Sequence, residues 1–319
     1  MTTPPLFVLG VSRSGTTMLR VILDRSPGIA IPDETFFVPQ LAHRHRGAVD
    51  TTAFLDDVRR LPRLVAWDVP AEDFAARLRP GMTTGEALDA VFSAYAAKHG
   101  KPRWGDKTPM YMRHLGLIER LFPDAQYVHL IRDGRDAALA FLDMPEGVVT
   151  RTWAHPRSPA GFACEWRTEV SRARDLGRRL GAARYLEIRY EDLVADSAAV
   201  VGSVCAFAGL PFEEQMLEFA GAVDVSAKPH HQRLLQPPTR GVRDWRTQLA
   251  EEDALAFERI AGDLLADLGY PLVDLPPRRP GARAAAALGW YRARMGAWNA
   301  AAYAAQRSPL WRRRHAPLI

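Results

Sequence analysis

The sequence predicts an α/β fold with an open parallel sheet flanked by helices. Short apolar runs of strand length recur along the chain, and stretches with helical periodicity separate them. Such alternation is typical of parallel sheets, because each parallel connection needs a crossover segment. A glycine-bearing turn also follows the first apolar run and opens a helical pattern. The sheet is therefore expected to be of the P-loop type, with ligands beyond the carboxyl ends of its strands.

The first elements follow the order strand, loop, helix. Leu6–Val11 is an apolar run that predicts a buried strand, and Thr16–Arg25 carries its apolar residues on one helical face. Pro27 ends that helix. A short strand-like piece, Ile29–Pro32, precedes another expected helix, Phe36–His45.

A helical insertion is expected over about residues 36–100. Its second half, 50–100, is amphipathic and is interrupted by several prolines. We interpret it as a lid or acceptor-binding insertion between the first and later strands. Arg103–Pro109 is expected to be a loop, and Tyr111–Phe122 a helix.

Two further buried strands are expected, at Gln126–Ile131 and Arg184–Tyr190. Helices are expected around and after them at Gly134–Leu142, Gly161–Leu180, Ser197–Ala208, Glu213–Phe219 and Glu251–Leu268. A long loop, 227–248, is rich in Pro, Gly, His and Arg, and long loops in compact domains are often functional.

The C-terminal part differs in composition from the rest. We expect one domain over residues 1–275 and a linker with a helical tail over 276–319, whose Ala-rich helix covers 283–306. Nine arginines and no acidic residue follow position 277. The tail helix is expected to pack on the domain or on a second subunit, and a homodimer through this helix is part of the prediction.

Composition narrows the function classes. The net charge is +5, and arginines outnumber the four lysines so strongly that compositional bias accounts for most of them. No nucleic-acid partner is expected.

The two cysteines, Cys164 and Cys205, are far apart and predict buried thiols in a reducing cytosol. No apolar run approaches 18 residues, and no Cys/His cluster has metal-ligand spacing, so a cytoplasmic protein without a transmembrane segment or a metal is expected.

The turn at Gly10–Thr17 is the most informative segment. It reads GVSRSGTT and keeps the glycine spacing of a nucleoside-triphosphate loop, but Thr16 stands where that loop carries its lysine. Backbone N–H groups at the following helix could still hold an anion. Arg13 adds a guanidinium fork to this loop. We therefore expect a phosphorylated nucleotide other than ATP.

Two other segments carry arginines toward the same edge. Arg132 follows the Gln126–Ile131 strand and is placed to pair with another phosphate, while Asp133 is expected to cap the next helix. Arg240, Gly241 and Trp245 lie in the long loop, which could fold over an anionic nucleotide.

These segments resemble those of PAPS-dependent sulfotransferases. VLGVSRSGTTMLRVILDRSP is similar to the family's 5′-phosphosulfate loop, and YVHLIRDGRDAALAF to its 3′-phosphate segment. YLEIRYEDLVAD resembles the later strand and turn beside the nucleotide, and RGVRDWR the closing loop. The matches run from about Leu6 to Leu268 in the family's order. They sit closest to the tyrosylprotein and bacterial branch, because Asp33-Glu34-Thr35 and Gly105–Pro109 follow in turn.

The resemblance implies a role for each matching residue. Glu34 would be the general base, and Lys107 with Arg13 would stabilise the transferred group and the leaving PAP. Arg132 would bind the 3′-phosphate, and Tyr190 would lie near the adenine. The remaining donor contacts would come from Arg13, Ser14, Gly15, Thr16, Thr17, Arg240 and Gly241. The resemblance thus implies PAPS as co-substrate, PAP as product, no metal, and an acceptor hydroxyl on a small molecule, glycan, lipid or peptide.

Two departures from the family pattern matter. A serine often stands eight residues after the 3′-phosphate arginine, where this chain has Ala140, so one hydroxyl contact is missing. The catalytic histidine of the cytosolic branch is also absent from the lysine segment, DKTPMYM, which favours Glu34 as the base.

Three functions stay open from the sequence. The first is the PAPS-dependent transferase. The second is a P-loop nucleotide kinase, against which the missing lysine speaks. The third is a non-catalytic protein that binds PAP or a sulfated ligand.

Overall fold

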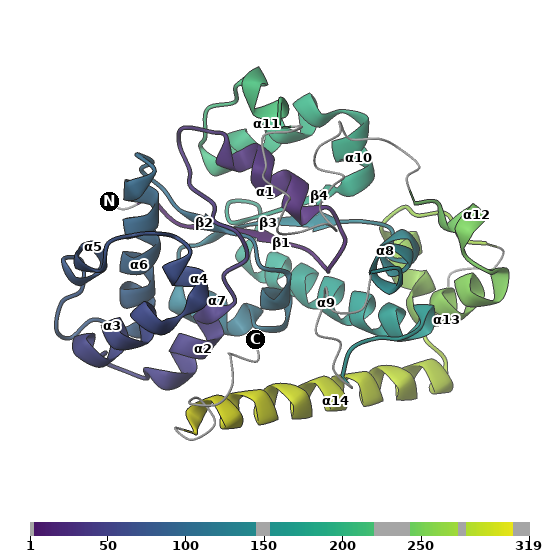
Figure 1. Cartoon of the computed structure of the whole chain (residues 1–319). Coiled ribbons are helices and arrows are strands. Elements are labelled where there is room, and N and C mark those ends of the chain that lie inside the picture. The colour runs from purple at the N-terminus through teal and green to yellow at the C-terminus, as the bar shows by residue number, and fades with distance from the viewer. Residues whose placement is uncertain (1–2, 145–153, 220–242, 274–278, 309–319) are drawn as a thin grey trace.

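The computed structural model confirms the α/β fold and describes residues 3–144, 154–219, 243–273 and 279–308 (Figure 1). Its sheet has four parallel strands in the order β2-β1-β3-β4. The strands are β1 (Leu6–Leu9), β2 (Gly105–Asp106), β3 (Gln126–Ile131) and β4 (Tyr185–Arg189). The three strands predicted from apolar runs are therefore all present.

The order of the strands reverses between β1 and β3. These neighbours pair from Leu6 opposite Gln126 to Leu9 opposite His129. The chain leaves β1 toward β2 and leaves β3 toward β4, on opposite sides of the pair. In open parallel sheets, ligands bind at the carboxyl ends of strands where such a reversal occurs. A ligand is therefore expected to bind at the segments after Leu9 and Ile131.

Both faces of the sheet are covered, because successive residues of a strand point to opposite sides. Leu6 and Val8 belong to one apolar cluster, and Phe7 and Leu9 to the other. The first cluster is closed by α1 (Thr16–Asp24), α10 (Tyr190–Ala195) and α11 (Ser197–Ala208), which lie above the sheet in Figure 1. The second is closed by α7 (Leu115–Leu121), α8 (Gly134–Leu142), α9 (Pro159–Leu180) and α13 (Glu251–Asp267).

The predicted insertion is helical. Its helices are α2 (Phe37–Arg44), α3 (Thr51–Arg60), α4 (Pro62–Val65), α5 (Ala71–Ala75) and α6 (Thr84–Lys98). Two of them begin with side-chain caps, from Asp50 for α3 and from the Thr83–Glu86 capping box for α6. Their buried faces join the same core as Phe7, so the insertion packs onto the sheet domain.

Three sequence predictions need correction. Arg103–Pro109 is not a loop throughout, because β2 forms within it and pairs with β1. A Cβ atom at Gly105 would lie 2.8 Å from the Leu6 carbonyl oxygen, so this glycine permits the approach. A strand of two residues shows no periodicity, which is why the sequence did not reveal it. The expected helix Tyr111–Phe122 is a 3₁₀ helix, Pro109–Arg113, followed by α7, and the expected Glu213–Phe219 helix is a 3₁₀ helix over Glu214–Leu217.

The tail helix α14 (Ala282–Arg307) packs on the chain's own domain. It contacts α2, α9 and α13, and runs along the lower side of the molecule in Figure 1. Leu288, Tyr291 and Met295 are buried in the shared core, whereas Trp290 is 67% exposed. One of the two expected positions, on the domain, is therefore confirmed, and the homodimer and the division at residue 276 stay predictions.

A short helix, α12 (Trp245–Gln248), ends the expected long loop, most of which lies outside the described residues, as does most of the expected linker. Cys164 and Cys205 are buried free thiols, as predicted. Within the described ranges, no helix combines the length and hydropathy needed to cross a bilayer.

Candidate active site

The turn after β1 has the backbone geometry of an anion-binding loop. Arg13 and Gly15 both adopt left-handed conformations, with φ of 71° and 92°. Gly15 is the N-terminal cap residue of α1, and no side chain caps this helix. The first N–H groups of a helix lack intrahelical partners, so those of α1 point out of the loop toward any bound anion.

Gly15 also allows another candidate residue to approach the loop. A Cβ atom at this position would lie 2.4 Å from Cδ2 of the Tyr190 ring. Tyr190 begins α10, directly after β4, so this contact brings the end of β4 to the loop. The structure therefore places Tyr190 beside the predicted 5′-phosphosulfate loop.

We expect Gly15→Ala to weaken PAP binding, because the added methyl group both strains the backbone and displaces Tyr190. Gly81→Ala is the matched control: its φ is 86°, but no atom lies within 4 Å of the added Cβ. Left-handed strain alone costs about 1–2 kcal/mol. Calorimetry with PAP and chemical denaturation should show a stability loss in both variants and a loss of PAP affinity only in Gly15→Ala. Equal PAP affinities would contradict the contact.

Arg132 joins the loop to the end of β3. Its Nη1 donates to the Arg13 carbonyl oxygen at 3.1 Å, and its guanidinium carbon lies 4.5 Å from the centre of the Tyr190 ring. The side chain is buried, and its Nε has no hydrogen-bond partner among the described residues. A buried N–H group without a partner costs free energy, so this donor is suited to an incoming anion.

Glu34 and Lys107 form a close ion pair at the other end of the loop. Lys107 Nζ lies 2.5 Å from Glu34 Oε1 and 3.1 Å from the Thr17 hydroxyl. The Lys107 side chain is fully buried, whereas that of Glu34 is 22% exposed. Burial lowers the pKa of Lys107 and the Glu34 carboxylate opposes this shift. The ammonium group that position 16 lacks is thus supplied by the segment after β2.

The predicted residues therefore gather in two adjoining groups. Arg13, Gly15, Arg132 and Tyr190 surround one side of the loop, and Thr17, Lys107 and Glu34 the other. Ser14 and Thr16 are buried in the loop itself. Arg240 and Gly241 lie outside the described residues. Ala140 is buried in α8, and its methyl side chain cannot supply the hydroxyl that a serine would offer at this position.

Asp133 caps α8, as predicted, and it also pairs with the side chain of Arg135. Its Oδ1 accepts from the backbone N–H of Arg135 at 3.0 Å, which caps α8. The Arg135 side chain is fully buried between Asp133 and Glu258, at 2.7 and 2.5 Å, and lies 3.7 Å from the Trp245 ring. Trp245 therefore packs on a structural arginine, and the sequence did not reveal the role of Arg135.

Sequence reasoning also missed three buried polar residues beside the Glu34–Lys107 pair. They are Thr35, Asp106 and Tyr111, each about 1% exposed and joined by hydrogen bonds. The sequence offered no signal for them, because polar residues such as those of Gly105–Thr108 are ordinary in a surface loop. His129, by contrast, is a packed core residue, with its Nδ1 2.6 Å from the Tyr185 hydroxyl.

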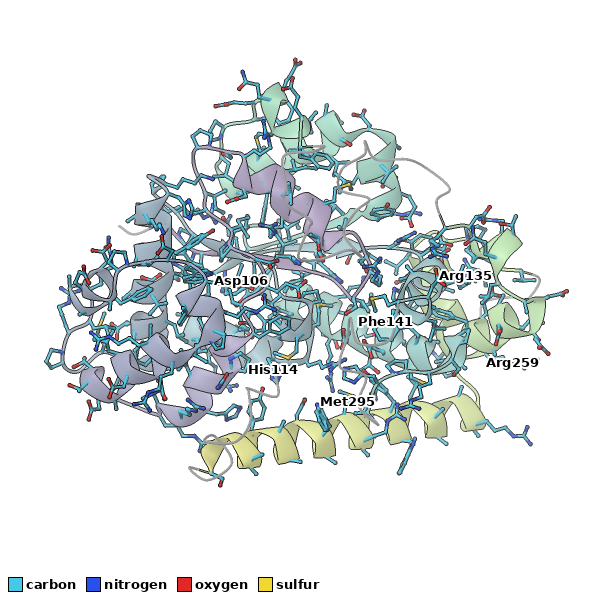
Figure 2. All side chains as sticks on the ribbon, in the orientation of Figure 1. Asp106, His114, Arg135, Phe141, Arg259 and Met295 are labelled. Atoms are coloured by element: carbon cyan, nitrogen blue, oxygen red, sulfur yellow. The ribbon has the colours of Figure 1, made fainter. Side chains whose placement is uncertain are left out.

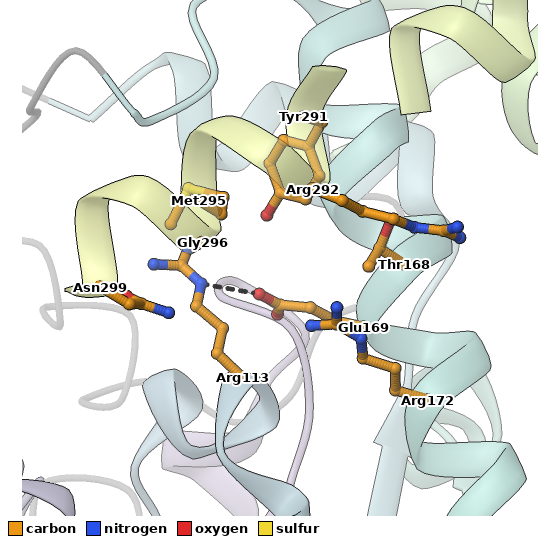
Figure 3. Close-up of a pocket in the computed structure, with 9 residues that line it drawn as sticks. All are labelled: Arg113, Thr168, Glu169, Arg172, Tyr291, Arg292, Met295, Gly296 and Asn299. Atoms are coloured by element: carbon orange, nitrogen blue, oxygen red, sulfur yellow. Dashed lines mark hydrogen bonds and ion pairs between the residues drawn. The ribbon is translucent and has the colours of Figure 1, made fainter. Parts of the chain in front are cut away.

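A separate cavity of about 170 Å³ lies between α9 and α14 (Figure 3). Arg113 crosses its floor and pairs with Glu169 at 2.9 Å and with Glu165 at 3.3 Å. Burial, followed by the Glu165 charge, raises the pKa of Glu169 to about 7. This cluster couples the tail helix to the domain, since Tyr291 of α14 contacts Glu165.

We expect Glu169→Gln to change how stability depends on pH. Because the pKa of Glu169 is higher in the folded protein than in the unfolded chain, the folded state holds the extra proton between about pH 4.5 and 7. The contribution of Glu169 to stability is therefore lost as the pH rises through this window. Urea unfolding should show that the variant gains stability relative to the wild type between pH 5 and pH 8. A constant difference would contradict the raised pKa.

Among the described residues, no cluster of three or more His, Cys, Asp or Glu side chains could hold a metal ion. The described site contains several donors: one buried ammonium group, the guanidinium group of Arg132 and the amides of α1. Such a set suits a ligand with several anionic groups, next to one carboxylate that can accept a proton.

Comparison with known proteins finds one matching family and several related proteins. A sequence model described as "Sulfotransferase family" matches residues 4–214, a range that contains Arg13, Glu34, Lys107, Arg132 and Tyr190. Protein-tyrosine sulfotransferase A of Caenorhabditis elegans is 25% identical over 240 residues, which cover 73% of this chain and 54% of that protein. Nodulation protein NoeE of Sinorhizobium fredii is 29% identical over 286 residues, covering 83% and 65%. The chain thus spans about half to two thirds of the length of these relatives.

Solved structures agree with the fold. The sulfotransferase domain from the curacin biosynthetic pathway superposes with a TM-score of 0.57 at 21% identity, covering 86% of this chain and all of that domain. The sulfotransferase domain of the Synechococcus PCC 7002 olefin synthase gives a TM-score of 0.54 at 26% identity, covering 86% and 96%. The open parallel sheet and its flanking helices are therefore shared with both.

Proposed function

The chain belongs to the sulfotransferase family, and from this we propose that it transfers a sulfuryl group from PAPS to the hydroxyl group of an acceptor. The observation that carries the proposal is the Glu34–Lys107 pair, held against Thr17 of the anion-binding loop. Lys107 thus lies within hydrogen-bond distance of both a carboxylate and the proposed anion-binding loop.

The donor nucleotide is proposed to lie along the carboxyl edge of β1 and β3. The 5′-phosphosulfate would accept hydrogen bonds from the amides of α1 and from Thr17, and Arg132 would bind the 3′-phosphate with its unpartnered Nε. Tyr190 would contact the adenine from beside Gly15. Arg240 and Gly241 are proposed to close over the 3′-phosphate on the strength of the sequence resemblance.

The chemistry then follows from the charges. The acceptor oxygen forms a bond to sulfur while the bond from sulfur to the bridging oxygen breaks, and the acceptor proton passes to Glu34. Negative charge grows on the leaving PAP, where Lys107 and Arg13 would stabilise it. Since little covalent chemistry is asked of the protein, positioning and charge stabilisation supply most of the rate.

The acceptor is proposed only as a hydroxyl-bearing compound. Relatives of this chain are named protein-tyrosine sulfotransferases, which makes a tyrosine-containing peptide one member of the test panel. A glycan, a lipid alcohol and a small phenol complete it.

Transfer of ³⁵S from labelled PAPS to this panel tests the proposal. We expect labelled product with at least one acceptor and release of PAP in equal amount. PAP binding without transfer to any member would favour the non-catalytic alternative. Consumption of ATP in the presence of magnesium would favour the kinase.

A further inference from the structure

Thr35 links the candidate base to the candidate cation through buried groups. Its backbone N–H donates to the Thr108 hydroxyl at 2.9 Å, and its own hydroxyl donates to Asp106 Oδ2 at 2.6 Å. Thr35 directly follows Glu34, while Asp106 and Thr108 flank Lys107. Both sides of the ion pair are therefore tied together one residue away from the reacting groups.

In this cluster each hydroxyl group accepts one hydrogen bond and donates the next, from Val38 through Tyr111 and Thr35 to Asp106. The Val38 N–H donates to the Tyr111 hydroxyl oxygen at 3.2 Å, so the Tyr111 proton is free to be donated to the Thr35 hydroxyl, 2.6 Å away. The Thr35 hydroxyl donates a hydrogen bond to Asp106, which also accepts one from Thr108. Because the Thr35 hydroxyl both accepts and donates, no apolar side chain of equal size can replace it.

The backbone next to Thr35 is strained. Phe36 has a φ of 59°, a left-handed conformation that is an outlier for a bulky residue. Such a conformation costs of order 1–3 kcal/mol and persists only where the surroundings impose it. The bonds at Thr35 and at Val38 fix the chain on either side of Phe36, and the Phe37 N–H donates across it to the Thr35 carbonyl oxygen at 2.7 Å.

We propose that Thr35 is a positioning residue, which acts with Asp106 and Tyr111 to hold the Glu34 carboxylate against Lys107. It touches neither donor nor acceptor in this account and works through the geometry of the pair. The inference rests on the proposed function for its effect on turnover, but its effect on Lys107 is independent of catalysis.

Three variants test the inference. Thr35→Val keeps the shape of the side chain and removes the hydroxyl, and Thr35→Ser restores the hydroxyl. Thr168→Val is the matched control, because Thr168 is equally buried on α9 and its hydroxyl has no partner among the described residues. Tyr111→Phe removes one donor and serves as the milder variant if Thr35→Val does not fold.

The first readout is the pKa of Lys107, measured by NMR with ¹³C-labelled lysine. The chain has only four lysines, and Lys107→Arg assigns the signal. Glu34 raises the pKa of Lys107 against the effect of burial. We therefore expect Thr35→Val to lower it by about one unit, as Glu34 moves away, and Thr35→Ser and Thr168→Val to leave it unchanged. An unchanged value in both Thr35→Val and Tyr111→Phe would overturn the proposal.

The second readout is turnover of PAPS with 4-nitrophenol as the acceptor probe. We expect Thr35→Val to lower kcat about 10- to 100-fold with little change in KM for PAPS, since a displacement near 1 Å has effects of this size. Thr35→Ser should recover most of the loss. If the wild type transfers the sulfuryl group to no member of the acceptor panel, the proposed function fails while the NMR comparison still decides the role of Thr35. If only KM changes, Thr35 supports donor binding and the proposal is wrong.

Discussion

Glu34→Ala should abolish sulfuryl transfer and leave PAP binding close to that of the wild type. The carboxylate is the proposed proton acceptor, and it is the more exposed member of its pair with Lys107. A positioned base contributes about 10²–10⁴-fold to a rate, so we expect kcat to fall by that factor. Transfer of ³⁵S and calorimetry with PAP measure the two quantities separately.

Glu34→Gln is the matched variant for this prediction. It keeps an oxygen that can accept from Lys107 and removes the basicity, so kcat should fall nearly as far as in Glu34→Ala. Asp33→Asn alters the neighbouring carboxylate, which pairs at 3.6 Å with the half-exposed Arg63, and should have little effect. Turnover near the wild-type rate in Glu34→Gln would show that another group takes the proton.

Arg132→Ala should weaken the binding of PAP far more than that of adenosine 5′-phosphosulfate, which lacks the 3′-phosphate. A hydrogen bond to a charged group contributes about 1.5–3 kcal/mol, which corresponds to a loss of about 10- to 150-fold in affinity for PAP. The loss for the second nucleotide should be several times smaller, and calorimetry with both ligands measures the difference.

Arg132→Lys separates charge from geometry. Lysine retains the positive charge but cannot reproduce the Nη1 bond to Arg13 together with a free Nε donor. We expect an intermediate loss of PAP affinity. Equal losses for PAP and adenosine 5′-phosphosulfate in Arg132→Ala would refute the assignment of the 3′-phosphate.

The fold could largely be predicted from the sequence, because the strands that form it are continuous apolar runs. Leu6–Val11, Gln126–Ile131 and Arg184–Tyr190 each contain a strand of the sheet, and the helices α8 and α11 have the predicted bounds. The exception is β2, whose two residues, Gly105 and Asp106, are defined by their pairing with β1 rather than by any pattern of their own.

The site could be predicted as a set of residues but not as a geometry. The turn after the first strand and the segment after Gln126–Ile131 indicated Arg13 and Arg132, because ligands gather at the carboxyl edge of a parallel sheet, whereas Glu34 and Lys107 were predicted only from the family resemblance. The sequence could not show that Lys107 lies beside Thr17, since 90 residues separate them and the contact arises only from the pairing of β2 with β1.

The buried network was beyond the reach of sequence reasoning for a similar reason. Thr35 and Tyr111 are separated by 76 residues, and Asp106 looks like an ordinary loop acid until β2 places it inside the sheet. Buried polar residues are recognised by the partners that satisfy them, and those partners are a property of the tertiary structure.

Calorimetric titration of the wild type with PAP and PAPS, and separately with ATP and magnesium, tests the central claim most directly. A loop without its own lysine, served by Arg132 and by the buried Lys107, should bind PAP and PAPS tightly and give no measurable heat with ATP and magnesium. Tight uptake of ATP and magnesium with no heat from PAP or PAPS would contradict the account.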